Sequence, residues 1–135
     1  DLALQLSCQN GHFEIVKFLV KMGTNIHTDD ELGLRLACKN GHMQIIKYLV
    51  QKGANINASD HRVFRVACEV GHLEVIKYLV GNGADIHIYN DWALVYACDN
   101  DYLEMAKFLV ENGANMYNNK KIYDYLTRNH FIKNW

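Results

Sequence analysis

The sequence predicts an all-α protein, a helix-turn-helix repeat solenoid of about four repeats closed by a C-terminal cap helix. The first observation is a period of thirty residues, marked by Cys8, Cys38, Cys68 and Cys98. The second is an apolar spacing of i, i+3, i+4, which is typical of amphipathic helices. The third is a glycine that recurs thirty residues apart after the second helical segment. Such a period indicates stacked units, none of which buries its apolar face alone.

Each unit contains two predicted helices. In the second unit the segment 32–39 places Leu34 and Cys38 on one side, and the segment 43–52 does the same with Leu49 and its apolar neighbours. Two short helices joined by about three residues must pack antiparallel. The predicted units are 1–28, 29–58, 59–88 and 89–117, which together form the domain 1–117, and the capping segment is 118–135.

Polar residues and glycines mark the expected helix ends. Asp30, Asp60 and Asn90 are the expected N-caps of the first helices. Each second helix is expected to end at a left-handed glycine. These glycines are Gly23, Gly53, Gly83 and Gly113. One apolar linker residue per unit is expected to lie under the stack, namely Ile26, Ile56, Ile86 and Met116.

The first helix of the first unit begins at Leu2-Ala3-Leu4 and has no evident polar cap of its own. Terminal repeats normally carry a polar outer face. A leucine-rich start therefore leads us to expect a further repeat ahead of Asp1. The segment after Asn115 loses the period but keeps helical apolar spacing, as a closing cap helix does.

The composition narrows the possible functions. Fourteen basic and fifteen acidic side chains leave a net charge of −1, which gives no field that would gather nucleic acid. No apolar run approaches the roughly 18 residues of a membrane span. The cysteines recur one repeat apart, about 10 Å, which is too far for disulfides, and they form no closely spaced zinc-type pairs. We expect free buried thiols, an intracellular and cytoplasmic location, and no cofactor, metal or small-molecule substrate.

The repeat resembles a known family. Gly71-His-Leu-Glu-Val-Ile-Lys-Tyr-Leu-Val80 followed by Gly83-Ala-Asp-Ile86 resembles the second helix and exit turn of an ankyrin repeat, and Leu36-Ala-Cys38 before Gly41-His42 resembles the end of its first helix. The match covers residues 1–116. The short units also resemble the ankyrin arrays of giant DNA viruses of amoebae, which would imply a location in the host cytoplasm.

The units depart from the ankyrin pattern in two ways. The Thr-Pro-Leu-His opening of the family is absent, and the period is thirty residues rather than about 33. Because the missing residues fall in the connecting loop, we expect shortened or absent β-hairpin fingers.

Two further sets of residues that recur at the same position of successive units have structural interpretations. We expect His12, His42 and His72 to tie the turn between helices by hydrogen bonds, rather than to act in catalysis or metal binding. The glutamates that stand three residues before a lysine in the second helices are expected to form salt bridges on a solvated face. These pairs are Glu14 and Lys17, Glu74 and Lys77, and Glu104 and Lys107.

The residues that vary between units suggest a binding face. By resemblance to ankyrin repeats, the positions before the first helix and after the cysteine line the concave face, where a scaffold presents a variable surface. Acidic residues surround two aromatic ones there, which favours a protein partner with a basic segment. The hypothetical partner-binding residues are Asp30, Glu31, Lys39, Asp60, His61, Glu69, Tyr89, Asp91, Trp92 and Asp99.

The sequence contains no catalytic constellation, so the protein is expected to be a non-catalytic scaffold rather than an enzyme. Two alternatives remain open. The chain could be a structural spacer within a longer ankyrin array. It could also be an adaptor whose tail recruits a partner to ubiquitin-ligase machinery, as the resemblance to viral ankyrin proteins implies.

Overall fold

The computed structural model describes residues 1–132, so the last residues of the expected cap, 133–135, lie outside the described part. The described residues form nine α-helices and no strand. The helices are α1 (Leu2–Asn10), α2 (Phe13–Lys21), α3 (Thr28–Asn40), α4 (Met43–Gln51), α5 (Ala58–Val70), α6 (Leu73–Gly81), α7 (Ile88–Asp99), α8 (Leu103–Glu111) and α9 (Lys120–Arg128). None of these helices is long and apolar enough to cross a membrane. The all-α helix-pair architecture predicted from the sequence is confirmed.

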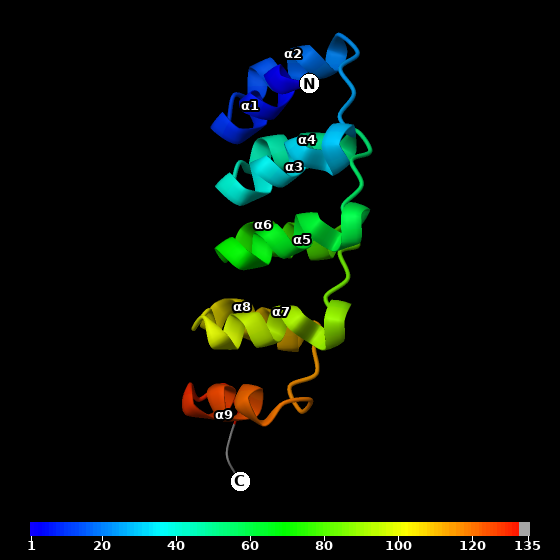
Figure 1. The fold of residues 1–135 in the computed structure, drawn as a ribbon. Helices are drawn as coiled ribbons and strands as arrows, with labels where there is room; N and C mark the ends of the chain where they lie inside the picture. The colour runs from blue at the N-terminus through cyan, green and yellow to red at the C-terminus, as the bar shows by residue number, and fades with distance from the viewer. Residues whose placement is uncertain (133–135) are drawn as a thin grey trace. The chain divides into compact units, whose positions relative to one another are not determined.

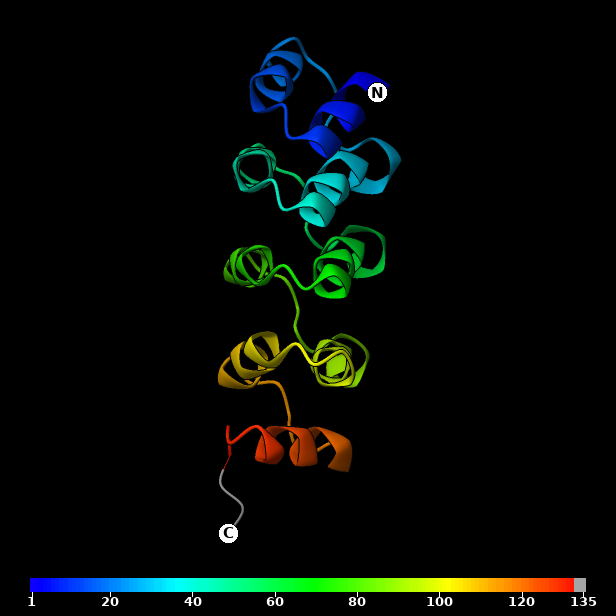
Figure 2. The same ribbon diagram turned by 90° about the vertical axis from the view of Figure 1, so that its left-hand side faces the viewer.

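The chain divides into two compact units, Asp1–Ala84 and Asp85–Trp135. In unit 1 the first helices α1, α3 and α5 form one layer and the second helices α2, α4 and α6 form another (Figures 1 and 2). Helix α1 packs on α3, and α3 packs on α5. In unit 2, α7 packs against both α8 and α9.

The cores lie between the two layers, on the predicted stripes. Leu34 and Cys38 of α3 are buried, as are Ile46 and Leu49 of α4. The linker isoleucines are buried too, whereas Met116 is half-buried. The apolar periodicity therefore identified the inward faces correctly, because a helix buries one stripe of its surface.

The second helices end as the glycine spacing predicted. After α4, Gly53 has a φ of 96°, the left-handed conformation that costs least without a Cβ. The Gly53 N–H donates to the Val50 carbonyl and the Ala54 N–H donates to the Leu49 carbonyl, both at 3.0 Å. This pair of bonds is the Schellman motif, and it satisfies two carbonyls that the helix end would leave unpaired.

The expected N-caps of the first helices are wrong. Asp30 has a φ of 56°, Asp60 of 57° and Asn90 of 52°, each at the centre of three successive left-handed residues. An N-cap residue lies in the extended region, so these side chains are not placed to cap the helix that follows. Asp, Asn and His tolerate left-handed backbone better than most residues, which accounts for their presence in these turns. The expectation that the first unit lacks a polar cap is also wrong, because the Asp1 carboxylate accepts from the Leu4 N–H at 3.1 Å.

Successive repeats of unit 1 are joined by histidine. His42 Nε2 lies 2.9 Å from the Gln9 carbonyl, and His72 Nε2 lies 3.1 Å from the Lys39 carbonyl. Since a carbonyl only accepts, Nε2 is the protonated nitrogen. The bond therefore reaches back to the preceding repeat, a partner that the sequence analysis did not specify. A Cβ added at Gly11 would lie 2.7 Å from the His42 ring, so this close approach requires glycine.

Helix α9 closes unit 2 as the predicted cap helix. The Asn119 side chain caps it by accepting from the Lys121 N–H at 2.9 Å. Ile122 and Leu126 are buried, while Asp124 is exposed. The helix is therefore amphipathic, with one face buried in unit 2.

Candidate protein-binding face

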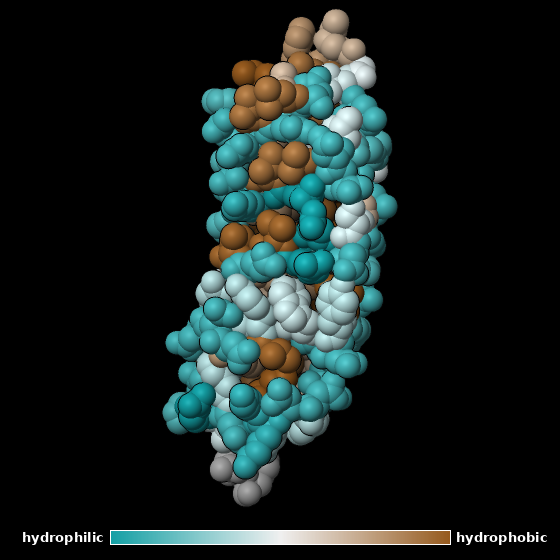
Figure 3. Space-filling model, in the orientation of Figure 1, coloured by the Kyte–Doolittle hydropathy of each residue, from teal (hydrophilic) through white to brown (hydrophobic). Residues whose placement is uncertain are grey.

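In unit 1 each first helix carries a partly exposed apolar side chain at the same position of the repeat. These residues are Leu6, Leu36 and Val66, two residues before the cysteine. Leu6 is 47% exposed, and Leu36 and Val66 are half-buried. Figure 3 shows apolar patches, separated by polar ones, over the layer that carries these helices. We call this row the first-helix face. An apolar centre with a polar rim is the composition of a protein-binding surface.

The arginines beside this row bond to the left-handed turns. Arg35 Nη2 donates to the Asp29 carbonyl at 2.8 Å, and Arg35 Nε donates to the Asp30 carbonyl at 3.1 Å. Arg65 Nη1 lies 3.4 Å from Asp60 Oδ2. Burial lowers the pKa of Arg35 from its ordinary value. The arginines thus offset part of the acidic charge that the sequence analysis assigned to this side.

Two of the predicted binding residues hold the left-handed turns instead. His27 Nδ1 lies 2.6 Å from Glu31 Oε1, and His87 Nδ1 lies 2.6 Å from Asp91 Oδ1. Asp91 Oδ2 also accepts from the Asn115 N–H at 3.0 Å. Both carboxylates are buried. Their assignment to a partner surface is therefore wrong, because a buried carboxylate already bonded to histidine is not available to a partner.

Unit 2 exposes an aromatic group around α7. The rings of Trp92 and Tyr96 have centroids 5.2 Å apart, and those of Tyr96 and Tyr102 are 6.3 Å apart. These three side chains are half-buried, and Tyr89 is 55% exposed. Partly exposed aromatic residues supply large contact area, which is why they are enriched where proteins bind one another.

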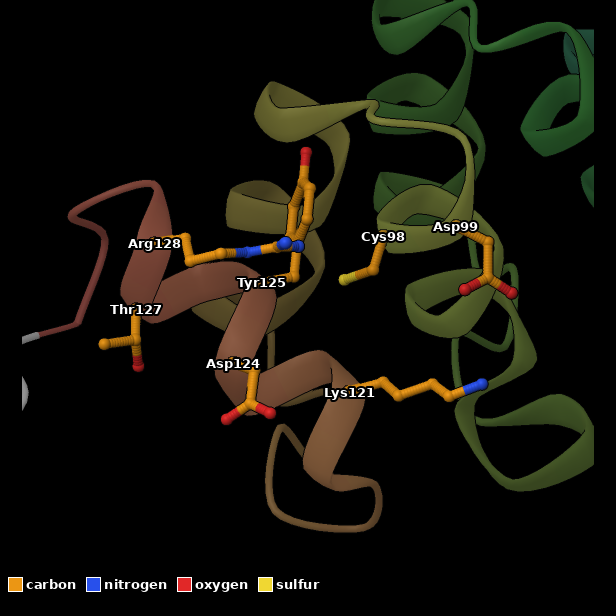
Figure 4. A pocket seen from close by; sticks show the side chains of 7 residues that line it. All are labelled: Cys98, Asp99, Lys121, Asp124, Tyr125, Thr127 and Arg128. Atoms are coloured by element: carbon orange, nitrogen blue, oxygen red, sulfur yellow. The ribbon is translucent and has the colours of Figure 1, made fainter.

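A cavity of about 660 Å³ lies between the end of α7 and α9 (Figure 4). Tyr125 forms part of its wall and donates its hydroxyl to Asp101 Oδ1 at 2.7 Å. Burial raises the pKa of Tyr125, and the bond to Asp101 raises it further. Acidic and basic groups line the cavity in equal number, so its charge selects neither an anion nor a cation. The lining residues are Cys98, Asp99, Lys121, Asp124, Tyr125, Thr127 and Arg128.

The cysteines are free thiols. Cys8, Cys38 and Cys68 are buried, whereas Cys98 is only half-buried, which differs slightly from the expectation. Burial raises the pKa of Cys8 to about 12 and that of Cys98 to about 11, so little thiolate forms at neutral pH. Among residues 1–132, no three His, Cys, Asp or Glu side chains come together as a metal site would require.

In the opposite layer of unit 1, two lysines pair with glutamates of the same helix. Lys17 lies 3.6 Å from Glu14, and Lys77 lies 3.6 Å from Glu74. In unit 2, Lys107 lies 3.5 Å from Glu104. The predicted salt bridges are confirmed. Their glutamates are exposed, so each pair contributes little to stability but reduces the positive field of the second helices.

A family model described as "Ankyrin repeats (3 copies)" matches residues 1–60 and 61–120. The chain belongs to the ankyrin repeat family. Ankyrin repeats generally mediate protein–protein interaction, and the family is typically non-catalytic. A comparison with curated proteins gave no match.

The remaining predicted residues of this ankyrin chain lie at or near the surface of their own units. Asp30, Lys39, Asp60, Glu69, Tyr89 and Asp99 are exposed, while His61 and Trp92 are half-buried. The sequence analysis missed the first-helix face. Its signal was an apolar residue at one outward helical position in each repeat.

Proposed function

We propose that this ankyrin chain is a non-catalytic scaffold that binds another protein through the first helices of its repeats. The observation that carries the proposal is the row Leu6, Leu36 and Val66. Each of these apolar side chains is partly exposed although it belongs to a helix with a well-filled inner face. In unit 2 the partly exposed rings of Trp92 and Tyr96 support the same role.

The proposal also draws support from the opposite layer. Lys17 and Lys77 there have glutamate partners. Lys47 and Lys52 lie over tyrosine rings at 5.9 and 5.5 Å from the centroids. Those cations already have neighbours within the chain. The first-helix face, by contrast, offers uncovered apolar surface, whose removal from water is the main driving force of association.

A basic segment in the partner remains part of the proposal in a weaker form. Asp30, Glu69 and Asp99 are exposed acids on the helices or turns concerned. Arg65, however, lies 3.4 Å from Asp60, which removes part of the charge contrast. Complementary charge mainly accelerates association and is screened by salt, so the association rate should fall as the ionic strength rises.

The test is affinity capture of the partner from the native cell with the whole chain and two matched double variants. Leu36→Lys with Val66→Lys alters the first-helix face. Gln44→Lys with Gln51→Lys adds the same charge to exposed positions of the opposite layer. Circular dichroism must show both variants folded. We expect the first pair to abolish capture and the second to retain it, and equal capture by both would refute the proposed face.

Two other roles remain proposals. A spacer role within a longer array is favoured by the exposed apolar residues of the first repeat, whereas an adaptor role for ubiquitin ligase would depend on the segment 118–135.

Free thiols and the absence of a disulfide among the described residues fit an intracellular location.

A further inference from the structure

Each apolar residue of the first-helix face has a second apolar residue beside it on the same helix. Leu2 is 69% exposed and Val70 is 37% exposed, while Leu32 is half-buried. Residues four positions apart on a helix are neighbours on one side, about 6 Å from each other. The first helices of unit 1 therefore present three apolar pairs, namely Leu2 with Leu6, Leu32 with Leu36, and Val66 with Val70.

The spacing of these pairs limits the conformation of a segment that lies along the stack. Helix α1 packs on α3 and α3 on α5, so equivalent positions recur about every 10 Å. A β-strand repeats its side chains on one face about every 6.7 Å, which does not match. An α-helix repeats a face every seven residues, about 10.5 Å, and polyproline II every three, about 9.3 Å. Only the α-helix offers two neighbouring apolar side chains per period, as the paired residues require.

The charge of this surface is positive over the helices themselves. After their left-handed turns, the first helices of unit 1 span 2–10, 32–40 and 62–70. These spans contain Arg35, Lys39, Arg62 and Arg65 but a single acidic residue, Glu69. Figure 3 shows strongly hydrophilic atoms beside the apolar patches over α3 and α5. The exposed acids Asp29, Asp30 and Asp60 belong to the turns instead.

Arg62 interrupts the apolar row, because it occupies the position of Leu2 and Leu32. Its side chain is exposed and has no carboxylate partner among the residues that the structure describes. Arg35 is tied to the carbonyls of Asp29 and Asp30. Burial lowers the pKa of Arg35, and the positive charge of Arg62 lowers it further, so the two guanidinium groups are near enough to repel each other. An anion brought to Arg62 would relieve that repulsion.

We propose that the first-helix face of unit 1 binds an amphipathic α-helix of a partner protein, which lies across α1, α3 and α5 and places a carboxylate on Arg62. Its apolar residues recur every seven positions and cover the three apolar pairs. Charge complementarity with the arginines carries the choice of an acidic residue, and the spacing of the pairs carries the choice of a helix. The acidic residue meets cations over the helices, whereas the basic segment considered above would meet the acids of the turns. The inference rests on the proposed function, whose partner it describes.

The experiment measures binding of synthetic helical peptides to the whole chain by fluorescence anisotropy. Each labelled peptide has about 21 residues, with leucines at the first and fourth positions of each heptad and helix-forming residues elsewhere. A glutamate replaces one leucine in the first heptad of one peptide and in the last heptad of another, because the helix can run along the stack in either direction. Matched peptides carry lysine in place of the glutamate. All are used below the concentration at which they self-associate.

We expect the wild-type chain to bind one glutamate peptide about three- to fivefold more tightly than its lysine counterpart, the range for a solvent-accessible ion pair. Arg62→Glu should reverse this preference, and Arg62→Leu, which completes the apolar row, should abolish it. The control Lys21→Glu makes the same charge change at an exposed position of α2 and should leave the preference unchanged. Circular dichroism checks that each variant is folded.

Two further peptides test the helical spacing. One has its leucine pairs moved to every eighth residue, and the other is proline-rich with a leucine at every third. Binding of either as tight as that of the heptad peptide would overturn the proposal, as would a preference that Arg62→Glu does not reverse. Binding by none of the peptides would also overturn it. The proposed function itself fails separately, if Leu36→Lys with Val66→Lys does not abolish capture of the partner.

Discussion

Replacing Leu49 by alanine tests whether the inward face of the second helices has been assigned correctly. Leu49 lies in α4 of unit 1 and is 1% exposed. Burying a leucine side chain fully stabilises a fold by about 1.5–3 kcal/mol relative to exposure. Since alanine leaves a cavity that neighbouring side chains fill only partly, the total loss should be about 2–5 kcal/mol.

Urea unfolding followed by far-UV circular dichroism measures the loss. With a slope of about 2 kcal/mol per molar urea, a loss of about 3 kcal/mol lowers the midpoint by roughly 1.5 M. The control is Gln51→Ala on the same helix, which is exposed and should change stability by no more than about 0.5 kcal/mol. A Leu49→Ala midpoint equal to that of Gln51→Ala would show that the buried face has been assigned to the wrong residues.

Two predictions concern ionisable groups. Thiol titration of the denatured chain should find all four cysteines free, and in the native chain Cys98 should react first because it is only half-buried, whereas faster reaction of Cys38 would contradict the burial. Tyr125→Phe should reduce the alkaline sensitivity of stability. The pKa of Tyr125 is raised in the folded state, so its contribution is fully present below the unfolded pKa of about 10 and is lost as the pH rises toward the folded value. The measurement is the free energy of unfolding of wild type and variant between pH 8 and pH 11. An equal fall with pH in both proteins would rule this out.

The backbone of the left-handed turns has an energetic consequence. Asp29, Asp30 and Glu31 lie at φ values of 52°, 56° and 61°, and a residue held in this region costs of order 1 kcal/mol or more. The His27–Glu31 bond spans the turn and places the Glu31 carboxylate in the interior. Because Glu31 Oε2 is buried without a partner among the described residues, this turn relies on the histidine bond.

The sequence alone determined the helix pairs, their inward stripes and the glycine ends. Leu34, Leu49 and Gly53 were assigned correctly because each depends on local spacing that every repeat copies. A helix buries the same stripe wherever it stacks, and a left-handed residue after a helix favours glycine whatever lies around it.

The tertiary structure alone decided which polar residues are surface and which are structural. Glu31 and Asp91 look like their exposed neighbours in the sequence, but the path of the linker turns them inward onto histidines. His42 bonds a carbonyl of the preceding repeat, a contact that its own repeat does not encode. Such contacts depend on where the backbone of one repeat lies against the next, and residue type and spacing within a repeat do not specify that geometry.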